Sequence, residues 1–115
     1  MSQALGRALI VEDNALLNGL LQEMVRALGF SVAGAATCAE ARDAINRSAF
    51  DLIVADLNLD HGRSGLSLAR EALLANRAIR VVIASGLPAP EELEASMAFL
   101  QKPFTVGQLQ RAILA

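Results

Sequence analysis

Hydrophobic and polar residues alternate along this chain in blocks that predict five strands and five helices. Short apolar runs, several rich in β-branched residues, predict strands at residues 7–11, 30–36, 51–55, 79–84 and 99–100. Helices are predicted at residues 17–28, 38–48, 66–76 and 105–115, with a short acidic helix at 91–96. Strand and helix therefore alternate through the whole sequence.

Two of these helices have a recognisable first turn. Thr37 is followed by Glu40, and Thr105 by Gln108, at the spacing of a capping box. In a capping box the hydroxyl and the longer side chain each accept a hydrogen bond from a backbone N–H that the helix leaves free. The starts of both helices are therefore fixed by the sequence itself.

The alternation predicts an α/β fold with a parallel sheet that is covered by helices on both faces. For five strands the common doubly wound order is 2-1-3-4-5, so we expect a flavodoxin-like (βα)5 sandwich. Pro88 and Pro90 predict that the fourth helix is short or irregular. The length of 115 residues suits one domain, and we assign residues 1–115 to it.

Polar residues follow four of the five predicted strands. Glu12 and Asp13 follow the first strand, Asp56 the third, Ser85 the fourth and Lys102 the fifth. Because the first and third strands are neighbours in the expected order, three carboxylates should crowd together at the carboxyl edge of the sheet. Like charges repel unless a cation lies among them, and Mg²⁺ prefers carboxylates, waters and phosphate oxygens. The sequence therefore predicts a Mg²⁺ site there.

A carboxylate in such a site is suited to phosphoryl chemistry, because an aspartyl phosphate is a known covalent intermediate. Lys102, the only lysine in the chain, would supply a second positive charge, and the Ser85 hydroxyl would bond a phosphoryl oxygen. The backbone carbonyl of Asn58 is placed to help hold the metal. A cis peptide bond before Pro103 would aim the ammonium group inward, since X–Pro is the bond type where cis costs little.

The composition argues against a nucleic-acid-binding protein, a membrane protein and a secreted disulfide-linked protein. The net charge of -2 gives no electrostatic attraction for nucleic acid or an anionic membrane, and Trp and Tyr are absent. No apolar run reaches the ~20 residues of a membrane span. Cys38 is the only cysteine, so an internal disulfide is impossible and a cytoplasmic location is expected.

The sequence resembles the receiver domains of two-component response regulators. The matching segments are LIVEDN (9–14), DLIVADLN (51–58), VVIASG (81–86) and FLQKPF (99–104). They occur in the order of the family, at about its spacings, and together they span the chain. The resemblance is closest to a stand-alone, single-domain response regulator.

This resemblance implies a role for each candidate residue. Asp56 would accept a phosphoryl group from the phosphohistidine of a sensor histidine kinase or a histidine phosphotransfer protein. Mg²⁺ would be held by Glu12, Asp13, Asp56 and the Asn58 carbonyl. Ser85 and Phe99 occupy the switch positions of the family, and Lys102 binds the phosphoryl group. The domain would be a switch that binds a downstream protein, and its only catalysis would be its own phosphorylation and dephosphorylation.

Three features depart from the family pattern. Asp60 stands where the family usually has proline, four residues after the acceptor, and the 58–65 loop is one residue longer than usual. The stretch between Ser85 and Lys102 is also shorter than usual. Because the usual dimer uses the fourth helix, we expect a monomer or a weak dimer.

Three alternatives stay open at this point. The chain could be a receiver-like interaction module that is not phosphorylated in the cell, or a receiver excised from a hybrid kinase or a larger regulator. It could also be a small aspartyl-phosphate phosphatase of the haloacid-dehalogenase kind, given the sequence Asp56-Leu57-Asn58. That class places its nucleophile after the first strand, whereas Asp56 follows the third.

Overall fold

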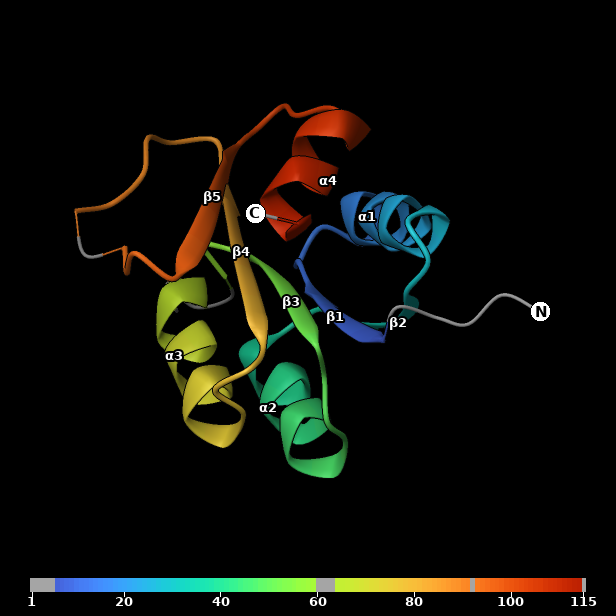
Figure 1. Cartoon of the computed structure of the whole chain (residues 1–115), viewed down its shortest axis with the longest axis vertical. Helices are drawn as coiled ribbons and strands as arrows, with labels where there is room; N and C mark the ends of the chain where they lie inside the picture. The colour runs from blue at the N-terminus through green and yellow to red at the C-terminus, as the bar shows by residue number, and fades with distance from the viewer. Residues whose placement is uncertain (1–5, 60–63, 92, 115) are drawn as a thin grey trace.

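A computed structural model describes residues 6–59, 64–91 and 93–114, and in these ranges four helices surround a five-stranded parallel sheet (Figure 1). The strands are β1 (Arg7–Val11), β2 (Ser31–Ala35), β3 (Leu52–Asp56), β4 (Arg80–Ser85) and β5 (Met97–Gln101). The helices are α1 (Ala15–Ala27), α2 (Cys38–Arg47), α3 (Gly65–Ala75) and α4 (Val106–Leu114). The predicted α/β alternation is confirmed except between β4 and β5, where no helix forms in the described residues, and the ends of the other elements differ slightly.

The strand order is β2-β1-β3-β4-β5, as predicted. All neighbouring strands are parallel, and β1 and β3 pair with Val11 level with Ala55. Asp56, one residue further along β3, is level with Ala84 of β4. This register brings the residues that follow β1 to the same edge of the sheet as the end of β3.

Apolar side chains of the central strands alternate between two cores. One face of the sheet packs against α2 and α3 through residues that include Leu9, Val11, Ile53, Ala55, Val81 and Ile83. The other face packs against α1 and α4 through residues that include Ala8, Ile10, Leu52, Val54, Val82 and Ala84. Figure 1 shows the same two layers, with α1 and α4 on one side and α2 and α3 on the other. Burial on both faces explains why these strands are almost continuously apolar.

Helix starts follow the local sequence. The Thr37 hydroxyl accepts from the Glu40 N–H at 3.1 Å, and Thr105 and Gln108 each accept from the backbone N–H of the other at 3.1 and 2.8 Å. Asn14 caps α1, because its Oδ1 accepts the N–H of the residue three positions on. None of the helices in the described ranges is long and apolar enough to cross a membrane.

The prediction of a short acidic helix at 91–96 is wrong for the residues that the structure describes. Between β4 and β5 these residues form bends and turns rather than a helix, and Glu92 lies outside the described residues. Pro88 and Pro90 cannot donate backbone hydrogen bonds. Leu93 packs against the core, and the carboxylate of Glu94 pairs with Arg70 of α3 at 2.7 Å. The fourth helix is thus replaced by an irregular segment, and β5 is longer than predicted.

Candidate functional site

Three carboxylates meet at the carboxyl edge of the sheet. Glu12 and Asp13 follow β1, and Asp56 is the last residue of β3. One ligand oxygen from each of the three lies within 4.8 Å of the others. The carboxylates differ in exposure, because Glu12 is buried, Asp56 is partly buried and Asp13 is exposed. The crowding that the sequence predicted is therefore present.

The Lys102 ammonium group joins two of these carboxylates. Its Nζ donates to Glu12 Oε1 at 2.8 Å and to Asp56 Oδ2 at 3.1 Å. The backbone N–H of Lys102 donates to the carbonyl of Ser85 at 2.7 Å, which ties the end of β5 to the end of β4. The Lys102–Pro103 peptide bond is cis. Lys102 reaches from β5 past β4 to the carboxylates that follow β1 and end β3.

Burial and charge act in opposite directions on these groups. The pKa of Glu12 lies above its ordinary value, mainly because the carboxylate is buried. The hydrogen bonds from Lys102 and from the Asn14 N–H lower this pKa, whereas the nearby Asp13 and Asp56 raise it further. Burial alone would lower the pKa of Lys102, but its hydrogen bonds to Glu12 and Asp56 outweigh this, so its pKa is raised. The site therefore keeps its ammonium charged and crowds its negative charges.

The backbone around Asp56 is fixed by several hydrogen bonds. Asp56 Oδ1 accepts the N–H of Asn58 at 3.2 Å. The N–H of Leu57 donates to the carbonyl of Ala84, and the N–H of Gly65 donates to the carbonyl of Leu57, both at 2.8 Å. Asn58 is exposed and forms an isolated antiparallel bridge with Ser64, which closes the loop at its base. Asp60 and the rest of residues 60–63 lie outside the described residues.

The two predicted switch residues lie on the strands beside this cluster. Ser85 is 1% exposed, and its Oγ accepts the N–H of Leu87 at 3.0 Å. Phe99 is level with Ile83 on the sheet, is partly buried and packs against the core beneath α2 and α3. The structure brings Glu12, Asp13, Asp56 and Lys102 into one cluster, whereas Phe99 forms part of the hydrophobic core.

Two residues at this edge have roles that the sequence analysis missed. Asn18 of α1 is a buried polar residue that bonds backbone groups at the ends of β1 and β2. Gly65 begins α3 so close to Asp56 that a Cβ atom there would lie 1.9 Å from the Asp56 carbonyl oxygen. The sequence does single out Asn18, because it is a polar residue on the apolar stripe of the first helix. Nothing in the sequence singles out Gly65 except its position in a predicted loop.

The donor set fits a hard divalent cation. The cluster offers three carboxylates, and Mg²⁺ binds through one or two carboxylates plus waters. Burial is the main cause of the raised pKa of Glu12, and the neighbouring Asp13 and Asp56 add to it. A divalent cation would neutralise the remaining negative charge, so the residues present suit Mg²⁺.

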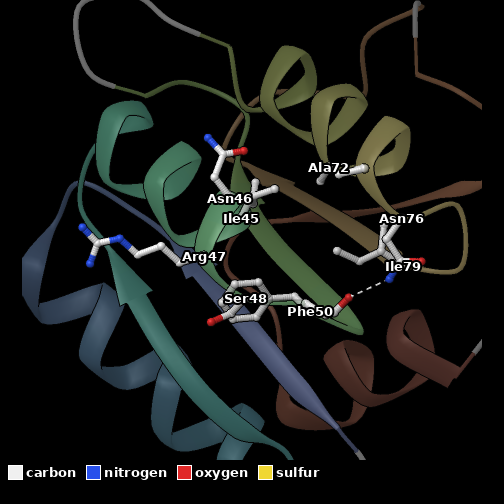
Figure 2. Close-up of a pocket in the computed structure, with 10 residues that line it drawn as sticks. Ile45, Asn46, Arg47, Ser48, Phe50, Ala72, Asn76 and Ile79 are labelled. Carbon is white, nitrogen blue, oxygen red and sulfur yellow. Dashed lines mark hydrogen bonds between the residues drawn. The ribbon is translucent and has the colours of Figure 1, made fainter.

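A separate cavity of about 330 Å³ lies at the opposite, amino edge of the sheet (Figure 2). Its walls include Ile45 of α2, Phe50 before β3, Ala72 of α3 and Ile79 before β4. Asn76 Nδ2 donates to the carbonyl of Phe50 at 3.0 Å, so this amide is already engaged. The cavity is mainly apolar and shares no residue with the carboxylate cluster.

Comparison with known proteins agrees with this geometry. The chain matches the family described as response regulator receiver domain over residues 8–114. A response regulator receiver protein from Sinorhizobium medicae superposes with a TM-score of 0.87 at 27% identity, covering 94% of this chain and 90% of that one. The receiver domain of the response regulator PhyR from Erythrobacter litoralis gives a TM-score of 0.84 at 28% identity, covering 96% and 88%.

A CheY-like receiver domain from Methanospirillum hungatei has the same fold, with a TM-score of 0.85 at 24% identity, covering 98% of this chain and 92% of that one. Among curated protein sequences none matches significantly. The family match covers nearly the whole chain and agrees with the predicted resemblance. The chain therefore belongs to the response regulator receiver domain family, whose members are signalling switches of two-component systems.

Proposed function

We propose that this receiver domain accepts a phosphoryl group on Asp56 from a phosphohistidine, in a reaction that depends on Mg²⁺. The donor is a sensor histidine kinase or a histidine phosphotransfer protein. The observation that carries the proposal is the contact of Lys102 Nζ with both Asp56 Oδ2 and Glu12 Oε1, inside a cluster of three carboxylates. This contact lies at the switch point of a doubly wound sheet, between β1 and β3, where such folds bind their ligands.

Residues of the chain supply the nucleophile, bind the phosphoryl group and hold the metal ion. A carboxylate oxygen of Asp56 attacks the phosphorus atom and forms the new P–O bond, while the P–N bond to the donor imidazole breaks. Lys102 holds a phosphoryl oxygen, because its ammonium group already lies 3.1 Å from Asp56 Oδ2. Glu12, Asp13, Asp56 and the Asn58 carbonyl would hold Mg²⁺. When bound, Mg²⁺ supplies positive charge that lets the anionic phosphoryl group approach the carboxylates.

The response to phosphorylation begins at Ser85. Its Oγ accepts the N–H of Leu87, so its hydroxyl proton is available to a phosphoryl oxygen at the neighbouring strand end. A Ser85 side chain that turns toward the phosphoryl group would release Leu87 and with it the start of the irregular segment before β5. Phe99 follows as the aromatic switch, and the changed surface binds a downstream protein.

The proposal includes the setting in which this switch works. We assign residues 1–115 to one receiver domain, which is a monomer or a weak dimer in the cytoplasm. Its partners are proteins rather than nucleic acid or membrane. Its own chemistry is limited to accepting the phosphoryl group and losing it again by hydrolysis.

Labelling with acetyl phosphate and Mg²⁺, followed by intact-mass measurement, tests the proposal. The wild-type chain should gain about 80 Da, the mass of one phosphoryl group. Asp56→Asn should abolish the gain, because the amide keeps the shape and removes the nucleophilic anion. Asp43→Asn is the matched control, since Asp43 is an exposed aspartate of α2 that pairs with Arg47 at the protein surface.

Asp43→Asn should be labelled at the wild-type rate. A wild-type chain that gains no mass would favour the alternative, a receiver-like interaction module without phosphorylation. Equal labelling of Asp56→Asn and wild type would show that another residue is the acceptor and would overturn the assignment.

A further inference from the structure

Glu12 has a hydrogen-bond partner for each of its four polar groups. Its N–H donates to the carbonyl of Ala35 at 3.1 Å. In its side chain, Oε1 accepts from Lys102 at 2.8 Å and Oε2 accepts the N–H of Asn14 at 3.1 Å. Its carbonyl accepts from Asn18 Nδ2 at 2.9 Å, the one hydrogen bond to this carbonyl in the described part of the chain. Glu12 is thus held by three separate elements of the fold.

Asn18 supplies the part of this arrangement that comes from inside α1. The side chain is 7% exposed, and Nδ2 donates both to the Glu12 carbonyl and to the Ala35 carbonyl, the second at 3.0 Å. These two carbonyls lie where β1 and β2 end and where their mutual pairing stops. The carboxamide therefore continues the sheet contact beyond the last pair of residues, and it joins the turn that carries Glu12 and Asp13 to the neighbouring strand.

The carboxamide of Asn18 is itself held in orientation. Gln22, one turn further along α1, donates from Nε2 to Asn18 Oδ1 at 2.7 Å. Space for this pair exists because residue 34 of β2 is glycine. A Cβ atom at Gly34 would lie 2.3 Å from Gln22 Nε2 and 2.9 Å from Asn18 Oδ1. Both hydrogens of the Asn18 amide are consequently directed at the two strand ends.

We propose that Asn18 is a positioning residue for the metal-binding pair Glu12 and Asp13, an inference that rests on the proposed function. Loss of the amide leaves the Glu12 carbonyl without its partner in a region that is largely closed to water. The peptide group between Glu12 and Asp13 is then free to rotate, and rotation moves the Asp13 carboxylate relative to Asp56. Outer residues that orient metal ligands in this way commonly account for a 10- to 100-fold change in metal affinity.

The test compares Asn18→Leu, which keeps a similar size without hydrogen bonds or charge, with Asn18→Ala as a second and smaller variant. Glu23→Leu is the matched control on the same helix, because Glu23 is exposed and its contact with Arg26 lies at the protein surface. Mg²⁺ affinity is measured by calorimetric titration of the folded proteins. Amide hydrogen exchange of Glu12 and Asn14 is measured without Mg²⁺.

Both Asn18 variants should bind Mg²⁺ about 10-fold or more weakly. In the absence of metal they should exchange the Glu12 and Asn14 amides faster, while Glu23→Leu stays within about twofold of wild type in both measurements. A purely structural role would lower Tm and leave the Mg²⁺ affinity of the folded protein unchanged, and that result would overturn the inference. An equal loss of affinity in Glu23→Leu would also overturn it, because the effect would then come from a general disturbance of α1.

Failure of the proposed function gives a different result. If wild type binds Mg²⁺ but is not labelled by acetyl phosphate, the phosphoacceptor role fails, while the order of Mg²⁺ affinities still decides the role of Asn18. If wild type binds no Mg²⁺, the positioning role is overturned as well, since there is then no ligand set to position.

Discussion

Substituting Gly65 by alanine should damage both the fold and the phosphoacceptor site. An added Cβ would lie 1.9 Å from the Asp56 carbonyl oxygen and 2.9 Å from the Asp56 carbonyl carbon. Ordinary close carbon–oxygen contacts are about 3.3 Å, so the two backbones must separate by more than about 1 Å. Neither atom belongs to a flexible side chain, and the movement therefore displaces either the end of β3 or the start of α3.

The size of the effect follows from this displacement. Forced separation of packed groups costs about 1–3 kcal/mol of folding free energy. For a domain of this size that corresponds to a drop in Tm of roughly 4 °C for each kcal/mol. The hydrogen bond of 2.8 Å from the Gly65 N–H to the Leu57 carbonyl would also be strained. Because a misplacement of about 1 Å can cost about 100-fold in rate, phosphorylation of Asp56 should slow by up to that factor.

Gly19→Ala is the control for this substitution. Gly19 lies inside α1, and nothing lies within 4 Å of an added Cβ there. Alanine is favoured over glycine in a helix by about 0.5–1 kcal/mol, so this variant should melt at a higher temperature and be labelled at the wild-type rate. If the reasoning holds, the Tm values of the two variants shift in opposite directions, and only Gly65→Ala is labelled more slowly than wild type. A Gly65→Ala protein with wild-type Tm and wild-type labelling rate would refute it.

Two further predictions concern the charged groups of the site. Asp13→Ala should weaken Mg²⁺ binding by about 10-fold or more and raise the Tm of the metal-free protein, because one of three crowded carboxylates is removed. If Mg²⁺ raises the Tm of this variant as much as it raises that of wild type, Asp13 is not a ligand. Lys102→Arg should slow phosphorylation and weaken the response to beryllofluoride, a phosphate mimic, because the wider guanidinium group cannot occupy the place of Nζ between Glu12 and Asp56. Amide NMR shifts near Ser85 and Phe99 measure that response, and wild-type shifts at saturating mimic would show that Lys102 acts only as a general positive charge.

The site could be predicted from the sequence because strand order alone decides which residues meet. Once β1 and β3 are neighbours in a parallel sheet, the residues after them share one edge, and Glu12, Asp13 and Asp56 come together without any detail of side-chain packing. The capping boxes at Thr37 and Thr105 were equally accessible, since they depend on contacts three residues apart.

The sequence marks Asn18 only as a polar residue on an apolar stripe and does not mark Gly65, and the roles of both could not be predicted because they depend on how a helix approaches the sheet. The amide of Asn18 acts on carbonyls at two strand ends, and the space at Gly65 is defined by the backbone of Asp56. The acidic helix before β5 failed for a different reason. Its glutamates favour a first turn, but Leu93 is one of few apolar residues there, so no apolar stripe exists to hold a helix on the sheet.

The unequal burial of the carboxylates would give Glu12 and Asp13 different parts in the proposed binding of Mg²⁺. Glu12 is buried and bonded to Lys102, so its position is set before any metal arrives. Asp13 is exposed, and it offers the incoming cation a carboxylate that still faces water. The three carboxylates together with the one ammonium group leave two negative charges, and one Mg²⁺ ion would neutralise them. Lys102 Nζ lies against Asp56 Oδ2, so in the proposed reaction it would move from this carboxylate to a phosphoryl oxygen, and the movement would loosen its contact with Glu12.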